Sequence, residues 1–177
     1  MKTGGARSAM LRIFQVESDA DRSHLRQLLL EYGEWVNARC IEEYDISFDT
    51  GDVLERTMDE LSQFYPPEGR LFLCEYDSQL AGCSCMRRIG DGIGEIKRMY
   101  VRPDHRGHGI GRSLLEDALT AARQNGYSTV RLDSTRFMKE AQALYRSAGF
   151  RDIEPYAESE IPEEWRRHWV FMELGLG

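Results

Sequence analysis

The chain has 177 residues, of which 41% are hydrophobic and 30% are charged, and this size and composition predict a globular protein with one buried core. The net charge of −7 argues against a nucleic-acid-binding protein, which needs a basic surface. No apolar run approaches the roughly 20 residues that cross a bilayer, and no signal-peptide pattern is visible, so we expect a cytoplasmic protein without a membrane partner.

Residues 1–9 carry no apolar pattern, so we expect a flexible lead there, followed by a single domain over residues 10–177. No internal repeat or linker divides this domain. The chain has four cysteines, Cys40, Cys74, Cys83 and Cys85. They lack the CxxC spacing of zinc sites, so we expect reduced thiols in the core and no metal site.

The first third of the chain predicts one strand and two helices. Alternating residues over 11–16 indicate the strand, and Ser18 then caps a helix with apolar residues at a period of 3.6. Residues 35–48 are aromatic, polar and interrupted, and they predict no clear element. A second helix is expected after Asp52 and should end before Pro66.

Three strands are expected in the middle of the chain. Residues 71–76 and 80–86 are apolar runs joined by Asp77-Ser78-Gln79, a pattern that predicts a β-hairpin. The glycine-rich segment GDGIG at 90–94 predicts another turn. We expect residues 95–101 to follow as a strand that pairs antiparallel with its predecessor.

The last third predicts two more helices and three more strands. The helices cover residues 112–125 and 137–148, and Gly126 and Gly149 end them. The strands cover residues 128–133, 151–156 and 168–174. Antiparallel strands therefore come first and a β-α-β unit comes later, which indicates an α/β (α+β) fold with a mixed, mostly antiparallel central sheet flanked by helices.

A glycine-spaced turn lies in the segment IKRMYVRPDHRGHGIG at residues 96–111, between a strand and a helix. Such a turn directs free backbone N–H groups at one point, at the positive end of a helix dipole, and favours phosphate. A Walker loop is a poor match, because Arg112-Ser113 stands where Lys-Ser/Thr is needed. A dinucleotide fingerprint is also a poor match, because the sixth position counted from Gly107 is Arg112.

Residues 106–111, Arg-Gly-His-Gly-Ile-Gly, follow the pattern Arg/Gln-x-x-Gly-x-Gly/Ala. The strand EIKRMYV precedes them, and RSLLEDALTAARQNG, VRLDS and AQALYRSAGF follow. With these segments the sequence resembles the GCN5-related N-acetyltransferase (GNAT) superfamily, strongly over residues 95–156 and more weakly over residues 11–86. The resemblance implies the GNAT fold, with a splayed strand pair that binds acetyl-CoA, and an acetyl-CoA-dependent N-acetyltransferase.

The resemblance also implies two sets of coenzyme A contacts. The turn and the helix start would receive the pyrophosphate through Arg106, Gly107, His108, Gly109, Ile110, Gly111 and Arg112, with His108 contributing only its backbone. The backbone of Met99, Tyr100 and Val101 would bind the pantetheine arm as though it were another strand. The Met99 N–H is then the expected donor to the oxyanion that develops on the acetyl carbonyl.

Two side chains are expected to take part in proton transfer. By analogy with the family, Tyr145 is the acid that protonates the departing thiolate, although it could also be a core residue that only packs. Glu95 is the expected base that takes the amine proton, directly or through water. The alternative for Glu95 is a solvated carboxylate at a strand end, and Asp133 is a weaker candidate for the base.

The amine substrate, a small molecule or a peptide, should bind between the first helical region and the final strands. The acidic loop at residues 154–164 could attract a cationic amine, but we expect it to be a solvated loop. No residue is placed as an acyl-carrying nucleophile, so we expect direct attack in a ternary complex. A non-catalytic acyl-CoA-binding sensor or interaction module with the same fold, transfer of another acyl group, and an alcohol acceptor remain alternatives. The oligomeric state is open, a homodimer included.

Overall fold

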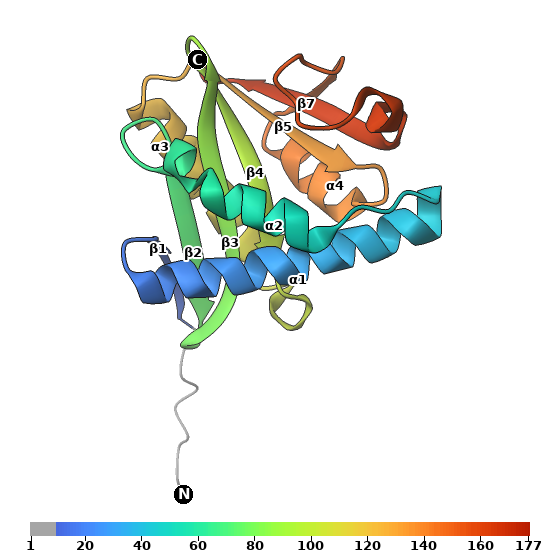
Figure 1. Ribbon diagram of the computed structural model, residues 1–177. Coiled ribbons are helices and arrows are strands. Elements are labelled where there is room, and N and C mark those ends of the chain that lie inside the picture. Colours follow the sequence, from blue (N-terminus) through green and yellow to red (C-terminus); the bar gives the residue numbers. More distant parts are fainter. Residues whose placement is uncertain (1–9) are drawn as a thin grey trace, which may run out of the picture.

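The computed structural model describes residues 10–177 and contains a seven-stranded mixed sheet in the order β1-β2-β3-β4-β5-β7-β6 (Figure 1). The strands are β1 (Leu11–Gln15), β2 (Arg70–Tyr76), β3 (Gln79–Gly90), β4 (Ile93–Val101), β5 (Thr129–Thr135), β6 (Arg151–Ile153) and β7 (Trp169–Gly175). Every neighbouring pair is antiparallel except β4 and β5, which are parallel. The predicted mixed, mostly antiparallel sheet is confirmed. The predicted flexible lead lies outside the described residues.

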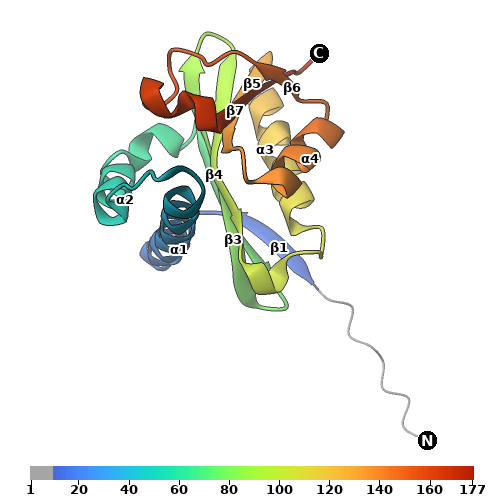
Figure 2. The same cartoon turned by 90° about the vertical axis from the view of Figure 1, so that its right-hand side faces the viewer.

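In the described residues, four α-helices cover the two faces of this sheet. They are α1 (Asp19–Tyr44), α2 (Thr50–Asp59), α3 (Ile110–Gln124) and α4 (Lys139–Ser147), with short 3-10 turns at Leu61–Phe64, Pro103–His105 and Glu163–His168. Figure 2 shows α1 and α2 on one face and α3 and α4 on the other. Separate apolar clusters pack each pair of helices against the sheet. Among the described residues, no helix combines the length and apolarity needed to cross a membrane.

Local capping chemistry explains where the first helices begin. Ser18 caps α1 as predicted, in a capping box that it forms with Asp21. The helix then continues through the segment at 35–48 that predicted no element, because Val36 and Cys40 extend its buried face into a third apolar cluster. The expected start of α2 after Asp52 was wrong. Asp49 is the cap, and its carboxylate accepts from the Asp52 N–H at 2.9 Å.

Strand β4 has two irregular features that shape the centre of the sheet. Its parallel pairing with β5 stops at Glu95 opposite Arg131, after which the two strands diverge (Figure 1). On its other side, β4 places Arg98 and Met99 opposite the single residue Ser84 of β3, which is a β-bulge with Arg98 at φ 54°. A bulge leaves a residue unpaired and redirects side chains. Because β4 and β5 diverge after Glu95, they form the splayed strand pair that the GNAT fold was expected to contain.

The predicted core thiols are confirmed, since Cys40, Cys74, Cys83 and Cys85 are all free and buried. Burial raises the pKa of the Cys85 thiol to about 12 and that of Cys40 to about 11. The thiolate is the nucleophilic form of cysteine. These side chains are therefore packing groups at neutral pH.

Candidate active site

A cavity of about 760 Å³ opens where β4 and β5 separate, between α1, the turn before α3, and α4. Its lining contains every residue predicted to contact coenzyme A except His108: Met99, Tyr100, Val101, Arg106, Gly107, Gly109, Ile110, Gly111, Arg112 and Tyr145. The ring of His108 packs instead against Tyr76, with 4.7 Å between ring centroids. We call this space the donor cavity.

Within residues 10–177, the backbone N–H groups of the glycine turn beside the donor cavity have no hydrogen-bond acceptor. Gly107 and Gly109 lie at φ 81° and 77°, in the left-handed region that other residues rarely adopt. Gly109 is the N-cap of α3, and among the described residues no side chain caps this helix. The first N–H groups of a helix lack partners within it, so this end is open to an anion.

Four basic side chains surround the same cavity, namely Arg39, Arg106, Arg112 and Lys139. Arg106 donates from Nε to the Val101 carbonyl at 3.1 Å, and Arg112 donates to the Ser147 hydroxyl at 3.0 Å. The sequence did not indicate Arg39 or Lys139, because they come from distant helices. Guanidinium and ammonium groups add charge-assisted contacts to phosphate, so the residues present fit an acyl donor that carries several phosphates.

We expect Gly109→Ala to lower the free energy of unfolding by about 1 kcal/mol, because alanine is strained at this positive φ. No atom lies within 4 Å of the added Cβ, so the loss is conformational and not steric. Gly111→Ala in the first turn of α3 is the matched control. Its Cβ meets only Leu144 at 3.5 Å, an ordinary contact. Urea denaturation should show a loss for the first variant alone, and equal losses would contradict this account of the turn.

Tyr145 lies on α4, lines the donor cavity and is 6% exposed. Among the described residues, no group accepts a hydrogen bond from its hydroxyl, and burial raises its pKa above the usual value. Tyr32 of α1 lines the same space, and burial raises its pKa to about 12. Tyr32 and Tyr145 therefore stay protonated near neutral pH, as does Tyr100, which also lines the cavity and whose pKa burial raises.

A second cavity of about 630 Å³ lies beyond Tyr32, which lines both cavities. It is enclosed by α1, α2, β5 and the loop that leads to β7, which is where the sequence predicted the amine substrate. We call it the acceptor cavity. Its charged lining comprises Arg56, Glu60, Arg87, Arg98, Asp133, Glu158 and Glu160.

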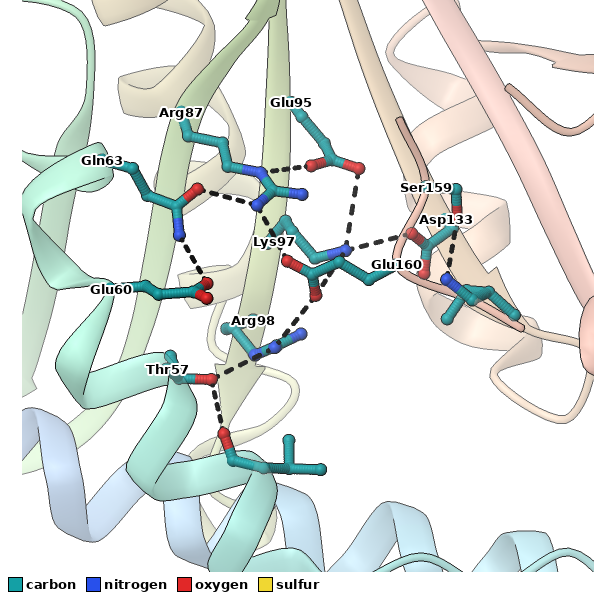
Figure 3. Close-up of polar contacts among 12 residues, drawn as sticks. Thr57, Glu60, Gln63, Arg87, Glu95, Lys97, Arg98, Asp133, Ser159 and Glu160 are labelled. Carbon is teal, nitrogen blue, oxygen red and sulfur yellow. Dashed lines mark hydrogen bonds and ion pairs between the residues drawn. The ribbon is translucent and has the colours of Figure 1, made fainter. Parts of the chain in front are cut away.

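Glu95 does not line either cavity and is 0% exposed. One of its oxygens accepts from Arg87 Nε at 2.7 Å (Figure 3). The other accepts from the Tyr156 hydroxyl at 2.7 Å. The alternative of a solvated strand-end carboxylate is therefore wrong. The role of Glu95 as base stays a prediction. Because its carboxylate is enclosed, it could accept the amine proton only through an intervening group or water. Asp133, in contrast, lines the acceptor cavity directly.

The acidic loop at 154–164 contains one residue that is not simply solvated. Glu160 contacts Arg87 at 2.8 Å, Lys97 at 3.4 Å and Arg98 at 3.3 Å. Burial alone would raise the pKa of its carboxyl, but Lys97, Arg98 and Arg87 outweigh burial and lower the pKa to about 2. Glu160 is still exposed, as expected of a solvated loop, but it is also fixed by ion pairs that the sequence did not predict.

The profile of the Acetyltransferase (GNAT) family matches residues 30–150, which is more than half of the chain and includes the donor cavity. The chain belongs to this family. It is thus an acyltransferase, and the predicted GNAT fold is confirmed.

Known GNAT proteins match this chain over most of its length. An uncharacterized N-acetyltransferase of Schizosaccharomyces pombe is 28% identical and covers 94% of this chain and 95% of its own. The uncharacterized N-acetyltransferase YjgM of Escherichia coli is 33% identical over 63% of this chain and 70% of its own. The crystal structure of the PaiA N-acetyltransferase of Thermoplasma acidophilum, in complex with coenzyme A, has a TM-score of 0.68 at 19% identity, covering 94% of this chain and 99% of its own.

Sequence reasoning missed most of the charged groups around the acceptor cavity of this GNAT protein. Arg87, Lys97 and Arg98 lie in strands, and no motif distinguishes them from surface residues. One signal was available for Lys97. It sits inside a largely apolar strand, where a charge is costly unless it is paired, and the structure pairs it with Asp133 at 3.3 Å.

Proposed function

We propose that this GNAT protein transfers an acetyl group from acetyl-CoA to a primary amine of a small molecule or peptide, by direct attack in a ternary complex. The observation that carries this proposal is the pair of cavities that meet at Tyr32. Two substrates can enter from opposite sides and bring their reacting atoms together at that point. The reaction then needs no acyl-carrying residue, which agrees with the burial of all four cysteines.

The chain's own residues fit the predicted roles on the donor side. Acetyl-CoA supplies a thioester, and its phosphates match the open N-terminus of α3 and the four basic side chains around it. Within residues 10–177, β4 has no strand partner on its β5 side beyond Glu95, so the backbone of Met99, Tyr100 and Val101 is free on that side to bind the pantetheine arm. We assign the Met99 N–H, next to the bulge, to the developing oxyanion.

Proton transfer requires an acid and a base near the junction of the cavities. We assign Tyr145 as the acid, because it stays protonated and lines the donor cavity. An alkyl amine has a pKa of about 10 and must lose a proton before it attacks. We assign the role of base to carboxylates beside the acceptor cavity. Asp133 can accept the amine proton directly because it lines the cavity, and Glu95 can accept it through Tyr156 or water.

Two measurements test the proposal in sequence. Coenzyme A at 100-fold excess over its Kd should stabilise the fold by about 2.7 kcal/mol and raise Tm by roughly 5–11 °C. Acetyl-CoA with a panel of amines, amino acids and peptides should then release free thiol in an amine-dependent manner. Binding without release across the panel would indicate an acyl-CoA sensor, and the absence of any Tm shift would refute the donor assignment.

A further inference from the structure

Three cations converge on one carboxylate at the acceptor cavity: Arg87 and Arg98 line the cavity, and the Lys97 side chain, which is 4% exposed, is buried beside it. Arg87 of β3 and the neighbouring Lys97 and Arg98 of β4 all contact Glu160, at 2.8, 3.4 and 3.3 Å (Figure 3). The bulge makes this convergence possible, because adjacent residues of a regular strand point to opposite faces of the sheet. The result is a compact site for one carboxylate.

The other acidic groups of this cluster leave one positive charge for Glu160 to neutralise. Arg87 is paired with Glu95 at 2.7 Å, and Lys97 is paired with Asp133 at 3.3 Å. Arg98 has Glu160 as its carboxylate partner, and the remaining contact of its guanidinium is the neutral Thr57 hydroxyl at 3.3 Å. Withdrawal of Glu160 therefore leaves an unpaired guanidinium facing the cavity.

Glu160 is the exchangeable member of the cluster. Its side chain is 37% exposed, against 0% for Glu95 and 12% for Asp133. The other two carboxylates stand on strands β4 and β5, whereas Glu160 stands on the loop between β6 and the 3-10 turn Glu163–His168. A loop can withdraw its side chain without breaking the sheet.

The same cavity contains polar groups that lack partners. Ser134 and Thr135 of β5 line it, and their hydroxyl oxygens are buried without a hydrogen-bond partner in the described part of the chain. A buried hydroxyl without a partner costs free energy and is rare in native proteins.

We propose that Arg87, Lys97 and Arg98 form a carboxylate subsite for the acceptor, which Glu160 fills in this structure and which an amino-acid acceptor takes over. The inference rests on the proposed acetyl transfer and names its acceptor class. Asp133 and Glu160 contact the same Lys97 ammonium, so they lie close together. A free amino acid can therefore place its carboxylate at the position of Glu160 and its amine beside Asp133.

The experiment compares each of the common amino acids with its own carboxamide, which keeps the amine and the side chain but lacks the negative charge. Initial rates of thiol release give KM for each pair. Calorimetric titration of the same compounds into the protein saturated with coenzyme A measures binding without turnover. At least one amino acid should bind and react at least tenfold better than its carboxamide.

Two variants identify the residues responsible. Arg98→Gln should raise KM for the amino acid about tenfold and leave KM for the carboxamide unchanged, because only the acid uses the guanidinium. Glu160→Gln should lower KM for the amino acid, because it removes a competing carboxylate. Arg88→Gln and Glu164→Gln are the matched controls. Arg88 pairs outside the cavity with Glu68 and Asp91, and Glu164 is an exposed residue of the 3-10 turn that follows the loop of Glu160.

The results that would overturn the carboxylate subsite differ from the results that would overturn the proposed acetyl transfer. Acetylation of carboxamides or other amines, with no preference for any amino acid, would overturn the subsite and leave acetyl transfer intact. A rise in KM for both compounds of a pair in Glu160→Gln would show that Glu160 binds the acceptor amine, and this too would overturn the subsite. Calorimetric preference for an amino acid without thiol release would support the subsite and contradict the transferase proposal.

Discussion

Replacement of Arg87 by leucine is expected to lower the free energy of unfolding by about 3–5 kcal/mol, the cost of leaving a buried charge without its partner. Arg87 is 8% exposed and holds three groups at once, Glu95 at 2.7 Å and both Gln63 and Glu160 at 2.8 Å. Without it, Glu95 keeps the Tyr156 hydroxyl and a longer contact to Lys97 at 3.7 Å. Guanidinium denaturation monitored by fluorescence measures the change.

The neighbouring residue supplies the control for this prediction. Arg88→Leu removes an arginine from the same strand, but its pairs with Glu68 and Asp91 are largely exposed, and such pairs contribute about 0–1 kcal/mol. The double variant Arg87→Leu/Glu95→Leu should be less destabilised than the sum of the two single variants, because it removes both charges of the buried pair. Equal losses for Arg87→Leu and Arg88→Leu would show that the network does not stabilise the fold.

The donor side of the site could be predicted from the sequence because its chemistry is local. Gly107 and Gly109 need positive φ, and the strand, turn and helix that position them are consecutive in the chain. The predicted anion site uses backbone N–H groups of this turn, which the glycine spacing alone can indicate. Helix capping is also local, and Ser18 therefore predicted the start of α1 correctly. The predicted start of α2 was wrong because two nearby aspartates could cap the helix, and Asp49, not Asp52, does so.

The acceptor side could not be predicted because it depends on contacts between distant segments. Glu95 meets Tyr156 across 61 residues, and Arg98 meets Glu160 across 62. The bulge that brings Lys97 and Arg98 to one carboxylate is a change of register between β3 and β4, and Arg98 is not a residue type that signals a left-handed backbone. Strand β6 also ends at Ile153, short of the predicted residue 156, because Tyr156 turns inward to reach Glu95.

Tyr145→Phe is expected to lower kcat about 100-fold, at the lower end of the range for general acid catalysis. We expect an effect of this size and not a larger one, because a thiol has a pKa of about 8.5 and its thiolate can leave without protonation, at a reduced rate. Affinity for coenzyme A should change little, because phenylalanine keeps the packing of the ring against Phe150, whose centroid lies 6.0 Å away. Single-turnover rates with acetyl-CoA, together with Kd for coenzyme A, separate the two quantities.

Tyr127→Phe is the control for the loss of a hydroxyl elsewhere in the protein. The Tyr127 hydroxyl donates to the Glu68 carbonyl, remote from the donor cavity, so kcat should stay at the wild-type value. If Tyr145→Phe also keeps the wild-type kcat, Tyr145 serves only in packing, as the sequence left open.

The pH dependence gives a second, independent test of the acid. Burial raises the pKa of Tyr145 above its usual value of 10.0, so the protonated form that donates dominates throughout an assay from pH 6 to 10. The ratio of wild-type to Tyr145→Phe kcat should therefore stay constant over that range. A ratio that falls towards 1 below pH 10 would mean that the phenol loses its proton there, which contradicts both its burial and its assignment as the acid.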